Sequence, residues 1–271
     1  MTCAWKELLA ILPGWLADAV DRRGRENLQE LRLRLGGLAE MVPGGDLDRP
    51  VTREDLNFCI NTASRYSPWA ARTIGEGFIT APGGHRIGIC GEAAVKDGGV
   101  IIRDVTSVCI RVARDFPGIS RGTEKLSGSI LLLGPPGSGK TTLLRDLMRR
   151  ISESQTTAVV DERGEIFPPG FRTGRHMDVL RGCPKAKGID MVLRTMGPEV
   201  IAVDEITAEE DCDSLIRAGW CGVRLVATAH AATVRDLQCR RVYRTLAEAK
   251  LFDHILVLSR DKSWRVERMD L

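Results

Sequence analysis

The amino-acid sequence predicts an α/β protein, in which a domain with a mostly parallel sheet at residues 121–271 follows a smaller α+β domain at residues 1–120. After residue 120, apolar strands alternate with amphipathic helices, as a parallel sheet requires. In residues 1–120, helical patterns are followed by short β-rich segments that are separated by glycine-containing turns. The 271 residues, 43% of them hydrophobic, suffice for two cored domains and exclude wholesale disorder.

The first domain is expected to open with an amphipathic helix within residues 8–16, which Pro13 kinks or splits. A Gly- and Pro-rich loop is expected at residues 42–46. Thr52, three residues before Asp55, predicts the capped start of a second helix. A small antiparallel sheet should follow, with strands at residues 78–80, 85–90, 100–102 and 107–112.

The second domain should hold a mostly parallel sheet whose strands alternate with helices along the chain. Strands are expected at residues 130–133, 156–160, 200–203, 223–227 and 254–258. Helices are expected near residues 140–151, 190–196, 208–218 and 234–249. Ligands of such sheets bind outside the carboxyl ends of the strands, so polar residues at those ends are the candidates for function.

The segment Gly-Pro-Pro-Gly-Ser-Gly-Lys-Thr follows the first of these strands and matches G-x-x-x-x-G-K-[ST], the phosphate-binding P-loop. Backbone N–H groups and the helix N-terminus there can bind a phosphate. Lys140 should reach the β- and γ-phosphates of ATP, and the Thr141 hydroxyl should ligate Mg²⁺. The expected nucleotide-binding set is Gly134, Pro135, Pro136, Gly137, Ser138, Gly139, Lys140, Thr141 and Thr142.

Two acids follow the apolar strand at residues 200–203. Adjacent acids at a strand end are common capping residues, but after a P-loop they indicate nucleotide hydrolysis. Asp204 is expected to hold Mg²⁺ through water, and Glu205 to polarise the attacking water. This makes Asp204, with Thr141, the expected metal site and Glu205 the expected catalytic carboxylate.

Two further strands are expected to end at the same carboxyl edge of the sheet, next to the phosphate-binding loop. One carries Asp161, Glu162 and Arg163, which are expected to bind the nucleotide. The other carries Thr228 and His230, either of which fits a sensor of the γ-phosphate and the nucleophilic water. The alternative to a sensor role is that His230 caps a helix and has its hydrogen bonds satisfied there.

Composition narrows the classes of partner. A net charge of +3 and 5% aromatic residues argue against nucleic acid as a partner. No apolar run is long enough to span a bilayer and no signal peptide is recognisable, so a cytoplasmic protein is expected. The eight cysteines include no C-x-x-C pair and are expected to be reduced rather than zinc ligands.

These motifs, in this order, resemble the type II and type IV secretion ATPases, which are RecA-like motors with an Asp box, a Walker B glutamate and a His box. The resemblance is closer to the stage III sporulation protein AA family of endospore-forming bacteria, and it covers nearly the whole chain. It includes residues 30–34, 64–67, 77–80, 83–88, 110–114, 178–180, 183–185 and 196–201.

The resemblance implies an ATPase that forms hexamers and energises a secretion-like channel together with the membrane proteins of its sporulation operon. It implies a location on the mother-cell side of the forespore membrane, peripheral to the bilayer. Arg103, Arg111 and Arg114 become candidates for completing the site in the same or a neighbouring subunit, and Arg194 could reach the same phosphates. The chain departs from secretion ATPases in having Asp204 where they have glycine, and in lacking their four-cysteine zinc module.

Two other functions remain open from the sequence. A nucleic-acid-dependent P-loop ATPase would share the same core, because a fold does not determine a function. A nucleotide-gated scaffold with little hydrolysis would share the same motifs.

Overall fold

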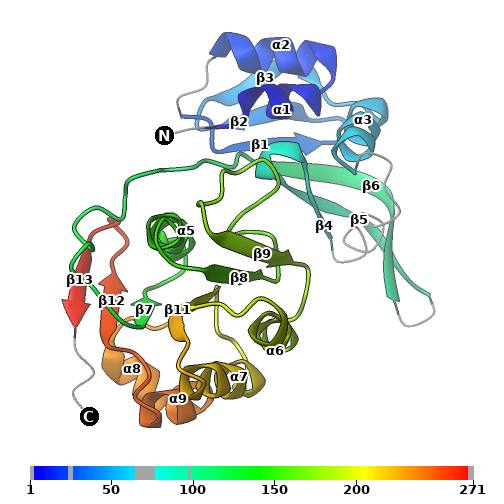
Figure 1. The fold of residues 1–271 in the computed structure, drawn as a ribbon. Coiled ribbons are helices and arrows are strands. Elements are labelled where there is room, and N and C mark those ends of the chain that lie inside the picture. The colour runs from blue at the N-terminus through cyan, green and yellow to red at the C-terminus, as the bar shows by residue number, and fades with distance from the viewer. Residues whose placement is uncertain (1–2, 24–26, 65–76, 97–98, 268–271) are drawn as a thin grey trace. The chain divides into compact units, whose positions relative to one another are not determined.

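The computed structural model describes residues 3–23, 27–64, 77–96 and 99–267 (Figure 1). Its internal contacts divide the chain into two compact units. The first comprises Met1–Asp115 with Pro168–Phe171, and the second comprises Phe116–Phe167 with Arg172–Leu271. The expected boundary at residue 120 lies inside the second unit, and the sequence gives no sign that Pro168–Phe171 groups with the first.

Within its described residues, the first unit is built on a six-stranded sheet in the order β3-β2-β1-β6-β5-β4, and its strand pairs are antiparallel. The strands are β1 (Glu30–Arg34), β2 (Leu38–Val42), β3 (Gly45–Pro50), β4 (Phe78–Thr80), β5 (Arg86–Lys96) and β6 (Gly99–Arg111). The helices are α1 (Trp5–Ala10), α2 (Gly14–Arg23), α3 (Arg53–Ser64) and the 3₁₀ turn η1 (Pro82–Gly84).

Local signals in the first unit predict its helices well. Pro13 splits the first helical pattern, because α1 ends at Ala10 and α2 begins at Gly14. The backbone N–H of Asp55 donates to the Thr52 hydroxyl over 3.2 Å, and the N–H of Thr52 donates back to the Asp55 carboxylate over 2.9 Å. This reciprocal cap confirms the predicted start of α3.

The strands of the first unit differ from expectation in several places. Strands β1, β2 and β3 were not predicted. The loop expected at residues 42–46 was wrong in extent, because β2 continues to Val42 and β3 begins at Gly45. The two strands expected at residues 100–102 and 107–112 are one strand, β6, which pairs along β5 with a register shift near Gly91. A Cβ on Gly91 would lie 2.7 Å from the carbonyl oxygen of Arg103, so only glycine fits there.

The second unit has a seven-stranded sheet in the order β13-β12-β7-β11-β10-β8-β9, parallel except for β13. The strands are β7 (Ile130–Leu133), β8 (Thr157–Asp161), β9 (Met177–Arg181), β10 (Val200–Val203), β11 (Arg224–Ala229), β12 (His254–Leu258) and β13 (Trp264–Glu267). The helices are α5 (Lys140–Ile151), α6 (Lys185–Thr195), α7 (Glu209–Trp220), α8 (Val234–Cys239) and α9 (Arg244–Glu248), with the 3₁₀ turn η2 (Arg241–Tyr243).

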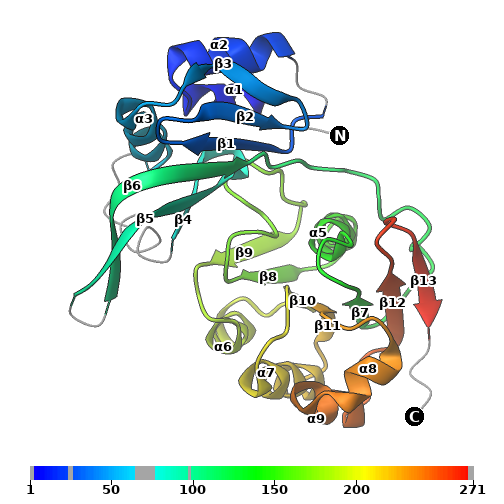
Figure 2. The same ribbon diagram turned by 180° about the vertical axis from the view of Figure 1, so that it is seen from behind.

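The central strands of this sheet are buried on both faces, which explains their continuous apolar sequence. Alternate residues, such as Leu132 and Leu131 on β7, pack into two separate cores. The first core contains α5, and the second contains α6, α7, α8 and α9. Figures 1 and 2 show these helices on opposite sides of the sheet.

The five predicted strands of the second unit are present, within two residues at each end. The edge strands β9 and β13 were missed, because their residues are half-exposed and partly charged. The helix expected at residues 234–249 is interrupted at Arg240, whose backbone is extended, and continues as η2 and α9. In the described part of the chain, no helix combines the length and apolarity that a membrane crossing requires.

Candidate functional site

A cavity of about 690 Å³ lies at the carboxyl edge of the second unit's sheet. The loop after β7 and the first turn of α5 form one wall of this cavity. The strand ends after β10 and β11 contribute Asp204, Glu205 and His230, and the turn after β12 contributes Lys262. The structure therefore brings the polar residues of three predicted strand ends to one place, as expected for a parallel sheet.

Glycines shape the loop between β7 and α5. A Cβ on Gly134 would lie 2.6 Å from the Ser138 hydroxyl oxygen and 2.8 Å from the Leu258 carbonyl oxygen. Gly139, which precedes α5, has φ +94°, a conformation that glycine adopts without strain. The N-terminus of α5 consequently opens into the cavity with its first N–H groups available to an anion.

Lys140 lies almost buried at the start of α5, with 6% of its surface exposed. Its ammonium donates to the carbonyl oxygens of Gly134 at 2.8 Å and Pro135 at 3.0 Å. Burial lowers the pKa of Lys140, while the carboxylates of Asp204 and Glu205 oppose that shift. The loop thus holds a cation at its centre, on carbonyl groups that a bound phosphate could replace.

Thr141 and Asp204 form the second part of the site. The Thr141 hydroxyl donates to Oδ2 of Asp204 at 2.7 Å, and the Thr228 hydroxyl donates to Oδ1 at 2.5 Å. The backbone N–H of Glu205 in turn donates to the Thr228 oxygen at 2.8 Å. A hydroxyl beside a carboxylate is the hard oxygen pair that suits Mg²⁺, so these residues fit that ion.

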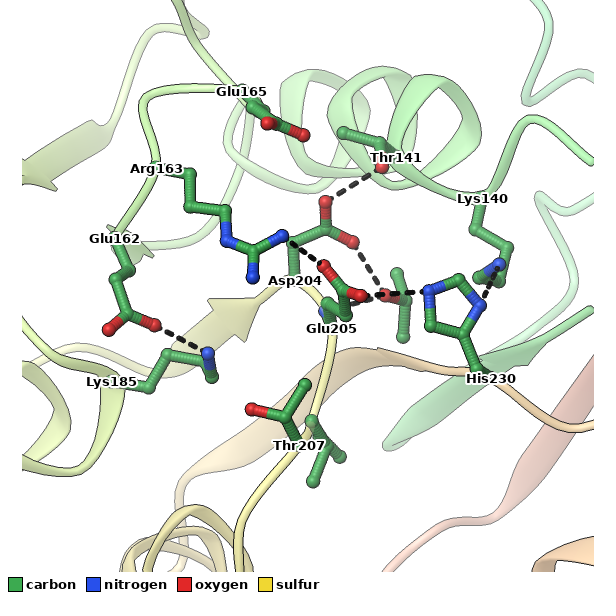
Figure 3. A network of polar contacts seen from close by, with 12 residues as sticks. Lys140, Thr141, Glu162, Arg163, Glu165, Lys185, Asp204, Glu205, Thr207 and His230 are labelled. Atoms are coloured by element: carbon green, nitrogen blue, oxygen red, sulfur yellow. Dashed lines mark hydrogen bonds and ion pairs between the residues drawn. The ribbon is translucent and has the colours of Figure 1, made fainter. Parts of the chain in front are cut away.

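Glu205 is held from two sides (Figure 3). One carboxylate oxygen lies 2.9 Å from Nε2 of His230, and the other accepts from Arg163 at 2.8 Å. Its backbone has φ +54°, which is uncommon for a residue with a side chain and is typical of functional sites. The structure therefore fixes both the backbone and the carboxylate of the residue predicted to activate water.

His230 lies between Lys140 of the phosphate loop and the carboxylate of Glu205. Its Nδ1 lies 3.1 Å from the ammonium of Lys140, which can only donate. Nδ1 must therefore accept, which leaves the proton on Nε2, facing Glu205. The helix-capping alternative for His230 is wrong, because Thr233 is the N-cap of α8.

Asp161 ends β8, and Glu162 and Arg163 follow it. Asp161 is buried and accepts from the backbone N–H groups of Glu165, Ile166 and Phe167, so its carboxylate organises its own loop. Burial raises the pKa of Asp161 despite these donors. Glu162 lies 2.5 Å from Lys185 at the start of α6.

Of Asp161, Glu162 and Arg163, it is Arg163 that hydrogen-bonds to Glu205, as given above. All three nevertheless line a small pocket together with Asp204 and Glu205, so their role in binding the nucleotide stays a prediction.

The candidate arginines come from both units. Arg111 pairs with Glu30 at 3.7 Å, Arg114 donates to the carbonyl of Leu28 at 2.8 Å, and Arg103 lies opposite Glu92, all in the first unit. Their roles stay predictions. Arg194 is exposed on the last turn of α6, and the described residues that line the cavity do not include it. Because α6 leads into the amino end of β10, Arg194 lies toward the opposite edge of the sheet, which corrects that expectation.

Several cavity residues were not anticipated. Phe116, Ile119 and Leu258 line its apolar part, and Lys262 and Trp264 come from the β12–β13 hairpin. The sequence signal available for the hairpin is weak: an Asp-Lys-Ser turn between an apolar strand and the half-exposed β13.

Comparisons with known proteins show the family of the chain. The sequence signature of the family described as sporulation stage III, protein AA, matches residues 7–267. Stage III sporulation protein AA of Bacillus subtilis (strain 168) is 35% identical over 280 residues, covering 94% of this chain and 91% of the relative.

Two solved structures share the fold. The pilus retraction motor PilT with bound ADP has a TM-score of 0.59 and 15% identity, covering 93% of this chain and 77% of that chain. The Legionella pneumophila ATPase DotB has a TM-score of 0.58 and 17% identity, covering 95% and 80%. The predicted resemblance to RecA-like secretion ATPases is confirmed at the level of the fold, and the chain belongs to the sporulation stage III protein AA family.

Proposed function

We propose that this chain binds and hydrolyses ATP with Mg²⁺, and that it works as the motor of a sporulation secretion channel. The observation that carries the proposal is the connected set Lys140–His230–Glu205 beside the Thr141–Asp204 pair, at the mouth of a P-loop. Each member has the chemistry that phosphoryl transfer to water requires. Family membership and the shared fold support the same activity.

Binding of the triphosphate would begin at the loop. The N–H groups at the start of α5 and the helix dipole attract the phosphates, and Lys140 exchanges the carbonyl oxygens of Gly134 and Pro135 for phosphate oxygens. Thr141 and Asp204 would hold Mg²⁺, which neutralises charge on the phosphates. The Phe116 and Ile119 side of the cavity is apolar and suits the nucleotide base.

Hydrolysis would depend on Glu205. His230 engages one oxygen of its carboxylate and Arg163 the other. Each oxygen keeps a second acceptor site, and opening either contact would make the carboxylate more accessible to water and a stronger base. When Lys140 moves to the phosphates, Nδ1 of His230 loses its donor and His230 becomes free to turn. In this way His230 would couple phosphate binding at the loop to the release of Glu205.

The double engagement of Glu205 also favours the second candidate, a nucleotide-gated scaffold whose isolated form hydrolyses little ATP. The two proposals differ in whether assembly releases the carboxylate. We propose that it does, in a homo-oligomer, with a hexamer as the expected form. In this assembly Arg103, Arg111 or Arg114 completes the site, next to membrane-channel proteins at the mother-cell face of the forespore membrane.

ATP binding and turnover should be measured for the purified chain over a wide range of protein concentration. Lys140→Ala should abolish ATP binding, while Lys187→Ala, on the exposed side of α6, should match the wild type. Turnover that rises with protein concentration supports the motor. Tight binding without turnover at every concentration, and with the membrane partners present, supports the scaffold instead. A wild type that binds no ATP would overturn both.

A further inference from the structure

A second lysine lies at the phosphate loop, on the β12–β13 hairpin. Strand β12 runs parallel to β7, so the turn after Leu258 emerges beside the loop that follows β7. The turn is fixed by its own hydrogen bonds: the N–H of Ser259 donates to the Ser263 carbonyl at 2.9 Å, and the Ser263 hydroxyl donates to Asp261 at 2.7 Å. Lys262 is therefore held at a defined position on the cavity wall.

The conformation of Lys262 is one that a lysine rarely adopts. Its φ is +72°, the left-handed region in which a turn normally carries glycine or asparagine. Its ammonium nevertheless donates to the carbonyl of Gly137, within the loop itself. A Cβ on Gly139 would lie 3.7 Å from Cδ of Lys262, so the side chain extends along the loop. Left-handed residues with side chains concentrate at functional sites.

The charges around the cavity show what this lysine could contribute. The described lining carries two lysines, Lys140 and Lys262, against three carboxylates, Glu165, Asp204 and Glu205. With His230 neutral, the sum of two positive and three negative charges is −1, and without Lys262 it would be −2. A nucleotide triphosphate stays negative after binding Mg²⁺, so each cation in the lining offsets repulsion that opposes binding.

We propose that Lys262 binds the phosphates of the nucleotide from the hairpin, as the second lysine of the site; this rests on the proposed ATP-binding function. Its flexible four-carbon stem allows the ammonium to leave the Gly137 carbonyl for a phosphate oxygen close to the same loop. The interaction is with charge, since an ammonium is a compact cation that attracts phosphate as a point charge.

The test compares ATP dissociation constants of the full chain carrying Lys262→Met or Lys262→Gln with that of the wild type, at low ionic strength. Gln can still donate to the Gly137 carbonyl but carries no charge. Both variants should bind ATP at least about tenfold more weakly, and both losses should shrink as salt screens the charge. Lys250→Met is the matched control, because Lys250 is also exposed and left-handed at φ +48° and does not line the cavity.

Three results would overturn the proposal. If Lys262→Gln binds ATP like the wild type while Lys262→Met binds it more weakly, Lys262 only anchors the loop. If both variants bind like the wild type while Lys140→Ala does not bind, Lys262 has no role although the proposed function stands. If the wild type itself binds no ATP, the proposed function fails first.

Lys262→Gly adds a readout that loop anchoring alone does not predict. It should raise the midpoint of thermal unfolding, because glycine relieves the left-handed conformation, and it should still weaken ATP binding. Lys250→Gly should raise the midpoint and leave ATP binding unchanged.

Discussion

The hydroxyl of Thr141 donates a hydrogen bond to the carboxylate of Asp204 over 2.7 Å, although 63 positions of the chain separate the two residues. Thr141 lies in the first turn of α5 and Asp204 follows β10, and the parallel sheet brings both to its carboxyl edge. The contact joins the phosphate loop to the strand that carries the expected catalytic acid. It also places two hard oxygen ligands together, which motivates the first prediction.

Removing either oxygen of this pair should affect binding only when Mg²⁺ is present. Thr141→Val and Asp204→Asn should each weaken ATP binding in Mg²⁺ by about tenfold or more, equivalent to about 1.4 kcal/mol. ATP binding measured in a chelator should change little. Asp213→Asn, exposed on α7, is the control. An equal loss with and without Mg²⁺ would show that the pair does not hold the ion.

The Arg163–Glu205 ion pair should restrain hydrolysis rather than stabilise the fold. Its side chains are 54% and 28% exposed, so removing it should change the free energy of unfolding by less than about 1 kcal/mol. Arg163→Met should raise ATP turnover of the isolated chain by about twofold to tenfold, because it frees the Glu205 carboxylate. Arg217→Met, which breaks the exposed pair with Asp190, should leave turnover unchanged. Slower turnover in Arg163→Met would identify Arg163 as a direct participant.

Asp146 on α5 fastens the segment that precedes β7. Its carboxylate accepts from the N–H groups of Gly118 at 2.9 Å and Ser120 at 2.8 Å. Burial alone would raise the pKa of Asp146, but these donors outweigh burial and lower it below 3.8. A carboxyl with a lowered pKa in the folded state contributes stability above its unfolded pKa and loses it as pH falls through the folded pKa.

Asp146→Asn should therefore lower the free energy of unfolding at pH 7 by about 1–3 kcal/mol. The difference from the wild type should narrow as pH falls from about 4 toward 3. Denaturant titrations across this range test the prediction, with Asp213→Asn as the exposed control. A difference that stays constant with pH would mean that the carboxylate charge is not what holds the segment.

Two glycines of the phosphate loop should respond differently to alanine. Gly134→Ala places a methyl group 2.6 Å from the Ser138 hydroxyl oxygen, so the loop must shift, and about 1–3 kcal/mol of stability and much of the ATP affinity should be lost. Gly137 has φ +75° with nothing within 4 Å of an added Cβ, so Gly137→Ala should cost only about 1–2 kcal/mol of backbone strain. Thermal unfolding and ATP titration of both variants provide the comparison. Equal effects at both positions would contradict the packing explanation.

The sequence predicts the centre of the site because local and periodic signals determine it. An apolar strand, a glycine loop and an amphipathic helix position Lys140 and Thr141, and the parallel arrangement brings the end of the 200–203 strand beside them. Asp204, Glu205 and His230 are found for the same reason. Each requires only the knowledge that the carboxyl ends of parallel strands share one edge.

The remaining features depend on contacts that no local pattern records. Asp161 accepts hydrogen bonds from three backbone N–H groups of the loop that follows it, which the strand-end rule does not anticipate. Lys262 reaches the loop only because β12 pairs with β7 across more than a hundred residues of sequence. Arg194 was assigned by its distance along the chain from β10, and the direction of α6 then takes it to the other edge.

The central claim, that Glu205 activates water at an ATP site built by Lys140, Thr141 and Asp204, is tested most directly by Glu205→Gln. This change keeps the size of the side chain and removes its charge. ATP turnover and ATP affinity should be measured on the same preparation, under assembly conditions in which the wild type hydrolyses ATP. Turnover should fall by about a hundredfold or more while the ATP dissociation constant stays within about threefold of the wild type. Wild-type turnover in Glu205→Gln would contradict the account.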